Sequence, residues 1–194
     1  MKKAEITRQF IIEKSAPIFN SLGYAGTSLQ DLTNATGLTK GSIYGNFENK
    51  DEVAIEAFKY NLGKMSALLQ SEMDKKQSYR EKLMVYPNVY DNFFTDRFLA
   101  GGCPVLNTSV ESDDTHPKLK AVTKKAFLSW KSSIADVIEN GKNAGEFKAE
   151  TNPEAAAFFI LATVEGLAMI GKLTQDEAHL KMITSNLRDF INTL

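Results

Sequence analysis

The 194-residue sequence predicts an all-α fold of about nine helices. Apolar side chains recur with helical periodicity along nearly the whole chain. No stretch shows the alternation of apolar and polar residues, enriched in β-branched side chains, that is typical of strands. Glycines, prolines and capping residues separate the periodic stretches. We therefore expect a small N-terminal domain of three helices, followed by a larger helical domain.

Composition narrows the classes of protein to which the chain can belong. A hydrophobic content of 43% is sufficient for globular cores. The single cysteine, Cys103, excludes an internal disulfide and a zinc site of paired cysteines, and two histidines leave little material for another metal. We expect no metal and no cofactor. Because no apolar run reaches the roughly 18 to 20 residues of a membrane span, we also expect a cytoplasmic protein without a membrane partner.

The charge is unevenly divided along the chain. The net charge of −1 is not the basic balance usual for proteins that bind nucleic acid. Residues 1–50, however, carry six basic and four acidic side chains, a net charge of +2. Affinity for DNA depends on the number of phosphates neutralised rather than on total charge, so charge alone does not decide the function.

The first helix is expected from Lys3 to Leu22, where Gly23 can adopt the left-handed conformation that ends a helix. Pro17 is expected to bend it locally. Its apolar residues predict the buried face, namely Phe10, Ile11, Ala16, Ile18, Phe19 and Leu22.

Two short helices follow with the spacing of a helix-turn-helix. Ser28 can cap a helix through Ala35, and Asp31 lies at the position of a capping-box acid. Gly37 ends that helix, and Thr39 can cap a second one that extends to about Asn46.

A longer fourth helix, capped by Asn49, is expected to reach about Lys75. The remaining helices are expected near Tyr79–Phe94, Val105–Ser112, Pro117–Asn143, Pro153–Leu173 and Gln175–Thr193.

The segment from Thr27 to Val53 resembles the DNA-binding signature of the tetracycline-repressor (TetR) family. It has a Thr-Ser helix start, an Ala-x-Gly turn, a threonine before a Lys-Gly helix, a Tyr-x-x-Phe pair and a lysine that opens the next helix. The family usually has histidine at the position of Asn46 and alanine at that of Thr33. The resemblance implies a DNA-binding domain at residues 1–50 and a ligand-binding and dimerisation domain at residues 51–194.

Short polar and glycine positions at the start of the second short helix would let its backbone approach base edges in the major groove. Tyr44 and Lys50 are expected to contact phosphates, and Gln30 a base. The apolar residues of the motif, such as Leu32 and Ile43, are assigned to packing. The predicted DNA-binding residues are Thr27, Ser28, Gln30, Thr39, Lys40, Gly41, Ser42, Tyr44, Asn46 and Lys50.

Aromatic residues cluster between Tyr86 and Phe98 and again on a later helix. Such clusters usually form a packed core, but they can also line a pocket between helices. On the second interpretation the pocket residues are Met65, Leu69, Tyr86, Tyr90, Phe93, Phe94, Cys103, Asn107, Glu111, Phe127, Trp130, Phe159 and Thr163.

The run from Gly101 to Glu111 resembles the start of the sixth helix in one subgroup of TetR-type regulators. Asn107, Thr108 and Glu111 could face a ligand or could equally satisfy backbone groups at a helix start. Cys103 could be a reactive thiol or, more often in such a setting, a buried inert one. His116, next to Pro117, is expected to be a capping or surface residue.

The last two helices are rich in small and apolar residues, and the first of them is apolar almost all round. In TetR-type proteins the corresponding pair forms a four-helix bundle with its copy, which implies a homodimer. Burial within one chain is the alternative. The predicted interface residues are Phe158, Ala162, Gly166, Met169, Ile183, Leu187 and Phe190.

These observations together predict a ligand-responsive repressor. We expect a dimer that binds double-stranded operator DNA and is released by a small apolar or aromatic inducer; repression is implied by the family resemblance alone. An enzyme is disfavoured because the sequence has no recognisable catalytic residues, phosphate loop or metal ligands. A helical interaction module without DNA binding is disfavoured by Tyr44 and Lys50.

Overall fold

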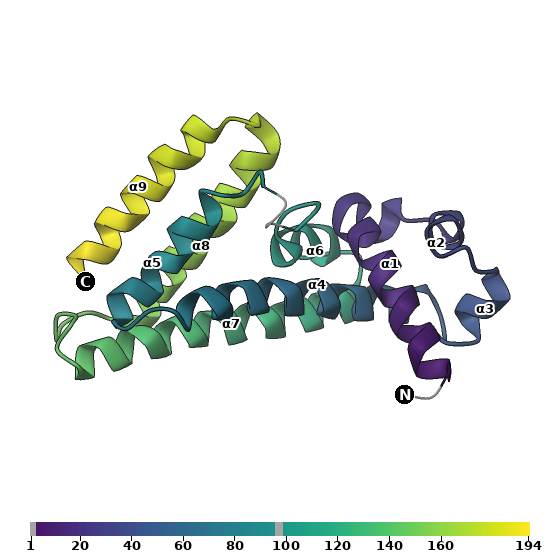
Figure 1. Cartoon of the computed structure of the whole chain (residues 1–194), viewed down its shortest axis with the longest axis horizontal. Coiled ribbons are helices and arrows are strands. Elements are labelled where there is room, and N and C mark those ends of the chain that lie inside the picture. Colours follow the sequence, from purple (N-terminus) through teal and green to yellow (C-terminus); the bar gives the residue numbers. More distant parts are fainter. Residues whose placement is uncertain (1–2, 96–98) are drawn as a thin grey trace. The chain divides into compact units, whose positions relative to one another are not determined.

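The structure is a computed structural model, and the residues that it describes are 3–95 and 99–194. The described residues form nine helices and confirm the predicted all-α fold (Figure 1). In chain order they are α1 (Lys3–Gly26), α2 (Leu29–Thr36), α3 (Lys40–Tyr44), α4 (Lys50–Met73), α5 (Tyr79–Tyr90), α6 (Pro104–Ser112), α7 (Pro117–Asn143), α8 (Pro153–Thr174) and α9 (Glu177–Thr193).

Most helix ends lie close to those expected from the sequence, and the ends of α1, α3 and α5 differ. Helix α3 ends at Tyr44 rather than Asn46, because the chain already turns at Gly45. Helix α5 ends at Tyr90 rather than Phe94, and residues 91–94 form turns. Phe98, which the sequence grouped with these aromatics, lies outside the described residues.

Gly23 interrupts α1 as expected, although one further turn follows it. Its φ of 74° and ψ of 178° are non-helical, and this φ favours glycine. A Cβ at this position would lie only 2.5 Å from the Glu111 carboxylate. Glycine is therefore required here both by backbone geometry and by the close approach of α6.

The described residues divide into two compact units. The first unit comprises those of Met1–Met65 and Leu99–Lys124, and the second those of Ser66–Phe98 and Lys125–Leu194. The first unit thus contains α6 and the start of α7 in addition to the segment expected to bind DNA. Assignment of DNA binding to residues 1–50, and of ligand binding and dimerisation to residues 51–194, stays a prediction.

The core of the first unit is built from α1 to α4 with Leu119 of α7. Helix α1 contributes Ile11, Ala16 and Phe19, as predicted. The prediction was wrong for Phe10 and Leu22, which are exposed, because the buried side chains follow a narrower stripe that includes Ser15 and Asn20.

The second unit is organised around α5, which packs against α8 and α9 (Figure 1). Its largest fully buried side chains come from these helices and from α7. They are Leu83, Tyr90, Ile134, Ile138, Ile160, Leu161, Leu167, Leu180 and Leu187.

Candidate nucleic-acid interface and ligand region

The helix-turn-helix is fixed by caps that the sequence predicts. Ser28 Oγ accepts a hydrogen bond from the Asp31 amide at 3.2 Å, and the Asp31 carboxylate accepts one from the Ser28 amide at 2.7 Å. Gly37, with φ 67°, ends α2 in the left-handed conformation. Thr39 Oγ1 then caps α3 by accepting from the Ser42 amide at 3.2 Å. These caps set where α2 stops and where α3 starts.

Helix α3 has a buried side and an exposed side. Ile43 is 0% exposed and anchors the helix in the core of the first unit. Lys40, Gly41 and Ser42 are exposed, as is Thr39 before them. The residues predicted to contact bases therefore share the solvent side of the helix.

Three other predicted DNA-binding residues are held by bonds within the protein. Thr27 is completely buried and donates to the Gly23 carbonyl at 2.6 Å, so its hydroxyl serves the fold, and DNA binding by Thr27 stays a prediction without support from its side chain. Asn46 donates through Nδ2 to the Ser42 carbonyl at 2.8 Å. Gln30 is exposed and donates to Asn34 at 2.8 Å, which orients it along α2.

Lys50 lies at the start of α4, above an aromatic ring. Its ammonium is 4.3 Å from the centroid of Tyr24, a cation–π distance. The Tyr24 hydroxyl donates to Asp51 Oδ1 at 2.6 Å. This hydrogen bond, with burial and the Asp51 charge, raises the pKa of Tyr24 to about 12. The same bond, despite partial desolvation, keeps the pKa of Asp51 below its usual range.

Asp51 also contacts the first turn of α7. His116 Nε2 lies 3.2 Å from Asp51 Oδ1, and Lys118 Nζ lies 3.7 Å from Oδ2. His116 Nδ1 accepts from the Leu119 amide at 3.2 Å, so the histidine caps α7. This confirms the capping alternative for His116. Tyr24, which supports Lys50, is thereby tied to α7 through Asp51.

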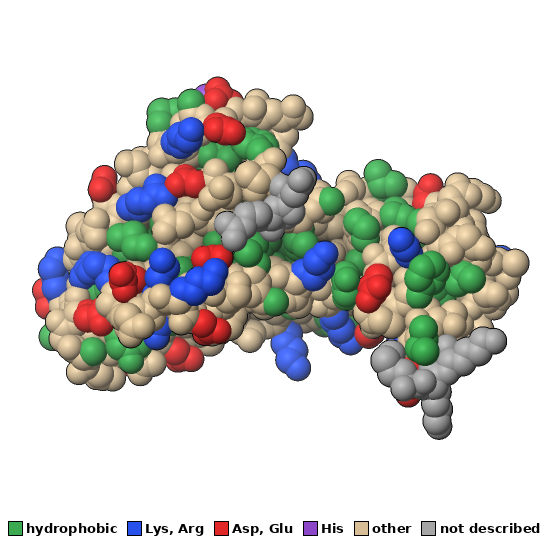
Figure 2. All heavy atoms as spheres, viewed as in Figure 1, with side chains coloured by type: hydrophobic (Ala, Val, Ile, Leu, Met, Phe, Trp, Pro, Cys, Tyr) green, Lys and Arg blue, Asp and Glu red, His purple; other side chains and the backbone are tan. Residues whose placement is uncertain are grey.

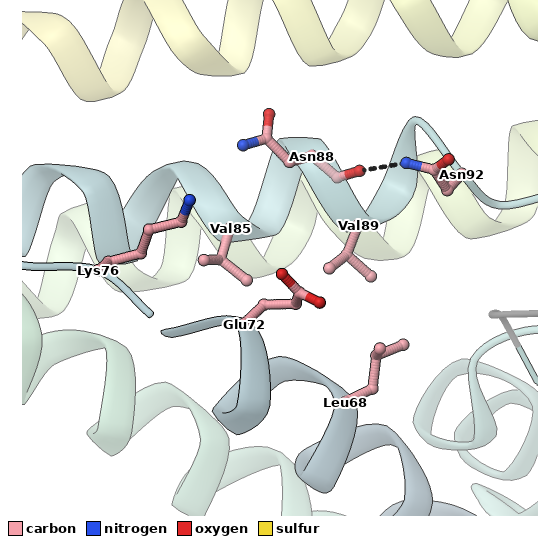
Figure 3. Close-up of a pocket in the computed structure, with 7 residues that line it drawn as sticks. All are labelled: Leu68, Glu72, Lys76, Val85, Asn88, Val89 and Asn92. Atoms are coloured by element: carbon pink, nitrogen blue, oxygen red, sulfur yellow. Dashed lines mark hydrogen bonds between the residues drawn. The ribbon is translucent and has the colours of Figure 1, made fainter. Parts of the chain in front are cut away.

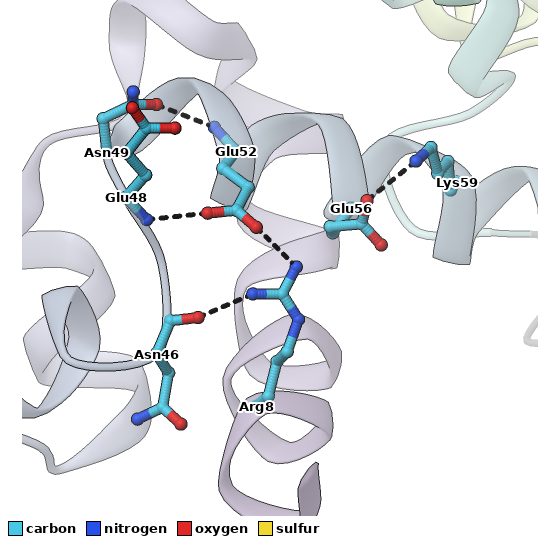
Figure 4. Close-up of polar contacts among 7 residues, drawn as sticks. All are labelled: Arg8, Asn46, Glu48, Asn49, Glu52, Glu56 and Lys59. Atoms are coloured by element: carbon cyan, nitrogen blue, oxygen red, sulfur yellow. Dashed lines mark hydrogen bonds and ion pairs between the residues drawn. The ribbon is translucent and has the colours of Figure 1, made fainter. Parts of the chain in front are cut away.

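Arg8 of α1 organises the connection between α3 and α4 (Figure 4). It donates to the Asn46 carbonyl at 2.6 Å and to Glu52 Oε1 at 2.7 Å. Glu52 Oε2 accepts from the Glu48 amide at 2.7 Å, and the Glu52 amide donates to Asn49 Oδ1 at 3.0 Å. The backbone hydrogen bond to Glu48, followed by the one from Arg8, keeps the pKa of Glu52 below its usual range.

Sequence reasoning missed Arg8 as a functional residue. The capping pair of Asn49 and Glu52 can be recognised from their spacing, since the acid follows the cap by three residues. Arg8 lies 44 residues away from Glu52, and no local pattern joins the two. The guanidinium also stacks 4.1 Å from the Phe47 ring centroid, so it fixes both ends of the short α3–α4 connection.

Helix α6 is attached to α1 by polar side chains. Glu111 accepts from the Tyr24 amide at 2.6 Å and from the Ala25 amide at 2.7 Å. Asn107 donates to the Asn20 carbonyl at 2.9 Å and to the Gly101 carbonyl at 2.8 Å. A small cavity of about 20 Å³ lies among these residues, large enough for about one water molecule. Asn107 and Glu111 thus satisfy backbone groups, which was one of the two alternatives, and the ligand alternative loses support.

The residues predicted to line a ligand pocket do not form one group. Met65, Cys103, Asn107 and Glu111 belong to the first unit, and the others belong to the second. The buried side chains among them are Met65, Leu69, Tyr86, Tyr90, Phe93 and Cys103. Phe94 is exposed because it follows the end of α5. Burial of Cys103 agrees with the inert-thiol alternative.

Tyr86 is the predicted pocket residue with the clearest polar environment. It is 3% exposed, and its hydroxyl accepts from Trp130 Nε1 at 3.2 Å. Burial raises the pKa of Tyr86 to about 12, against the opposing effect of that hydrogen bond. The two rings lie 6.2 Å apart, centroid to centroid. Phe127 lies on the same helix as Trp130 and is partly exposed.

The cavity in the second unit has a different lining, at the end of α4 and along α5 (Figure 3). Its volume is about 140 Å³. None of the predicted pocket residues lines it. The lining residues are Leu68, Glu72, Lys76, Val85, Asn88, Val89 and Asn92.

Apolar side chains are exposed along α8 and α9. Phe158 and Met169, two of the predicted interface residues, are 43% and 53% exposed, and Ala162 is exposed between them. Phe159 and Thr163, which were predicted to line the pocket, lie beside them on the partly exposed side of α8. The ring centroids of Phe159 and Phe190 lie 4.2 Å apart. Leu187 is the exception, since it is 1% exposed and belongs to the core, so its assignment to the interface was wrong.

Helix α8 also has the length and composition to cross a membrane, although 44% of its most apolar window is buried inside the chain.

The face shown in Figure 2 has basic and acidic side chains interspersed, in agreement with the net charge of −1. Among the described residues, no three or more of histidine, cysteine, aspartate and glutamate are grouped so as to hold a metal ion.

Two parts of the chain match known protein families. Residues 11–57 match bacterial regulatory proteins of the tetR family, and residues 80–187 match the tetracyclin repressor-like C-terminal domain. The crystal structure of a TetR-family transcriptional regulator from Cytophaga hutchinsonii is 45% identical, with a TM-score of 0.93 over 98% of this chain and 96% of that chain.

Curated relatives are similar in sequence over most of their length. The uncharacterized HTH-type transcriptional regulator YxaF of Bacillus subtilis (strain 168) is 27% identical over 93% of each chain. The HTH-type transcriptional repressor DhaR of Mycobacterium sp. (strain GP1) is 23% identical over 87% of this chain and 84% of its own.

Proposed function

Because the chain belongs to the tetR family of bacterial regulatory proteins, we propose that it represses transcription as an operator-bound homodimer that a small molecule releases. The family and the similar proteins are DNA-binding transcriptional regulators, not enzymes. The operator, the repression, the dimer and the inducer are the parts that we propose.

The observation that carries the proposal is that α3 has one buried side and one exposed side. Ile43 is completely buried, while Lys40, Gly41 and Ser42 are exposed on the other side. A recognition helix needs this arrangement, because its backbone must come close to the base edges in the major groove. Packing within the protein does not require glycine at position 41, because a Cβ there would meet only the Thr39 hydroxyl, at 3.9 Å. The absence of a side chain at Gly41 would instead let the backbone of α3 come closer to the DNA.

Phosphate contacts would come from residues around this helix. Lys50 provides a cation at the start of α4, and Tyr44 is partly exposed at the end of α3. Ser28 is exposed at the N-terminus of α2, where backbone amides favour an anion. Such contacts fix the orientation of a protein on DNA, whereas Lys40, Ser42 and Gln30 would contribute to the choice of sequence.

The proposed dimer uses the exposed apolar side of α8 and α9. A contiguous apolar face on a soluble protein commonly marks an interaction surface. Phe158, Ala162, Gly166 and Met169 recur at three- and four-residue intervals, so they share one side of α8. Two copies joined there would present two recognition helices to the two halves of a pseudo-palindromic site.

The proposal also specifies the direction of regulation, which is repression, and the kind of molecule that relieves it. A relative, DhaR, is described as a repressor, which supports repression here. The inducer is proposed to be a small apolar or aromatic molecule bound by the C-terminal region. It can release the operator only if it binds the two states of the protein with different affinities. The resulting coupling free energy between the two sites is typically about 1 to 3 kcal/mol. Because the target is DNA, we propose a cytoplasmic location.

In vitro transcription from the promoter next to the protein's own gene tests this proposal. Purified protein is expected to lower the transcript yield. In nuclease footprinting of the same promoter, it is expected to protect two half-sites whose centres are about one or two helical turns apart. Increased transcription with the same protection would overturn repression, and protection of a single half-site would overturn the dimer.

A further inference from the structure

The first turn of α7 brings a second exposed lysine to the start of α4. Lys118 Nζ lies 3.7 Å from Asp51 Oδ2, and Asp51 directly follows Lys50, the residue proposed to contact a phosphate. Asp51 Oδ1 accepts from the Tyr24 hydroxyl, and the Lys50 ammonium lies over the Tyr24 ring. Both ammonium groups therefore contact members of one hydrogen-bonded pair, Tyr24 with Asp51.

This turn of α7 is held against the helices of the first unit on both sides of Lys118. His116 caps α7 through the bond from the Leu119 amide, and its Nε2 lies 3.2 Å from Asp51 Oδ1. The His116 ring also packs edge-on against Tyr24, with 4.5 Å between the ring centroids. Leu119 is 3% exposed and belongs to the core formed with α1 to α4. The backbone at Lys118 is therefore fixed relative to the start of α4.

The Lys118 ammonium is available to a phosphate. Its side chain is 68% exposed, and its distance to Asp51 is too long for a hydrogen bond. Asp51 has two closer partners, since the Tyr24 hydroxyl lies at 2.6 Å and His116 Nε2 at 3.2 Å. These two donors stabilise the carboxylate without Lys118. An exposed ion pair of this kind contributes little, so Lys118 loses little when it binds another anion.

A phosphate bound by Lys50 would have close neighbours. Each strand of duplex DNA carries one charge about every 3.4 Å along the helix axis. Charges within about 8 Å of one another still interact at physiological salt. We propose that Lys118 of each subunit binds a backbone phosphate of the operator near the one bound by Lys50. The proposal rests on the function proposed above, and it extends the DNA interface beyond the helix-turn-helix to α7.

Fluorescence anisotropy of the full-length protein tests this contact, with the duplex from upstream of its own gene at several salt concentrations. Lys118→Ala is expected to lower the slope of log affinity against log salt by about one for each subunit. Affinity for this duplex and for an unrelated duplex should fall by a similar factor, because a phosphate contact carries no sequence information. Lys118→Arg should keep the wild-type slope, since it keeps the cation.

Lys120→Ala is the matched control. Lys120 is also exposed and lies two residues further along α7, where its ammonium donates to the Asp113 carbonyl at 2.7 Å. Residues two apart on a helix do not share a side, so this lysine should make no contact next to Lys50. Its replacement should leave the slope at the wild-type value. An equal fall of the slope in Lys118→Ala and Lys120→Ala would show a general effect of charge and overturn the proposal.

A double variant separates a phosphate contact from an indirect role. When Lys50→Ala and Lys118→Ala are combined, the two changes of slope should add, because each lysine binds its own phosphate. A double variant with the slope of Lys50→Ala alone would show that Lys118 acts through Lys50, and would overturn the proposal.

Urea denaturation of Lys118→Ala completes the test. Lower stability with an unchanged salt slope is the result expected of a residue that only supports Asp51, and it would overturn the phosphate contact while operator binding stands. A wild-type protein that binds no duplex, even at low salt, would overturn the proposed function and this contact with it.

Discussion

The Arg8 guanidinium donates a 2.7 Å hydrogen bond to Glu52 Oε1, and this joins the first helix to the first turn of the fourth. The same guanidinium bonds to the Asn46 carbonyl, next to the end of the proposed recognition helix. A residue without a proposed DNA contact thus fixes the segment between α3 and Lys50. The geometry of the proposed DNA interface therefore depends on Arg8, a side chain that is not itself proposed to contact DNA.

Replacement of Arg8 by alanine is predicted to weaken operator binding about tenfold. Without the guanidinium, the Asn46 carbonyl and the Glu52 carboxylate each lose a hydrogen bond from Arg8, so the connection from Asn46 to Asn49 can move relative to Lys50. The dependence of affinity on salt should keep its slope, because no phosphate contact is removed. Fluorescence anisotropy at several salt concentrations measures both quantities.

Arg188→Ala is the control for that experiment, because Arg188 pairs with Asp91 in the second unit and should not influence operator affinity directly. Equal affinities for the wild type and Arg8→Ala would contradict the positioning role.

Replacement of Lys50 by alanine is predicted to have a different signature. Loss of one phosphate contact should lower the slope of log affinity against log salt by about one and weaken binding to all sequences alike. Tyr24→Phe keeps the ring beneath Lys50 but loses the bond to Asp51, so its effect should be smaller. A Lys50→Ala protein with an unchanged salt slope would show that Lys50 contacts no phosphate.

The pair of Tyr24 and Asp51 is predicted to contribute to the pH dependence of stability. The pKa of folded Asp51 is lowered from 3.8, so its contribution is present above that value and is lost as the pH falls through the lower folded pKa. The pKa of folded Tyr24 is raised to about 12, so its contribution is present below pH 10 and is lost as the pH rises through about 12.

Urea denaturation at a series of pH values tests this pair. In Asp51→Asn the free energy of unfolding should fall less steeply below about pH 4 than in the wild type. Tyr24→Phe, which removes the main cause of the shift, should reproduce the change. Parallel profiles for all three proteins would contradict it.

Replacement of Met169 by glutamate is predicted to dissociate the dimer. Met169 is 53% exposed in the single chain, and a carboxylate buried in an apolar interface would lack a partner. Sedimentation velocity should show a monomer at micromolar concentration, with operator affinity strongly reduced. Val110→Glu, at an exposed apolar position of α6, should remain a dimer. A dimeric Met169→Glu protein would move the interface elsewhere.

Local signals in the sequence predicted the fold well. The caps at Ser28 and Thr39 and the left-handed Gly37 mark helix ends through contacts within four residues. Such contacts depend on neighbouring residues and little on the rest of the chain. Burial of Ile43 followed in the same way from helical periodicity.

Contacts between distant segments could not be predicted in this way. Glu111 and Asn107 bind backbone atoms of α1 that lie 86 and 87 residues away, and only the folded chain brings them together. The aromatic residues from Tyr86 to Phe98 left a packed core and a pocket as alternatives, and Tyr86, Tyr90 and Phe93 are buried, as a stripe that fills a core would be. The cavity instead lies beside valines and asparagines, whose pattern carries no distinct signal.

The central claim is that the exposed side of α3, together with Lys50, binds operator DNA. The most direct test is titration of a fluorescent duplex from the region upstream of the protein's own gene, at several salt concentrations, with Tyr44→Ala and Lys50→Ala alongside. We predict saturable binding by a dimer, with affinity that falls steeply as salt rises and is weaker in both variants. Absence of binding to this duplex and to a pool of genomic fragments, even at low salt, would contradict the claim.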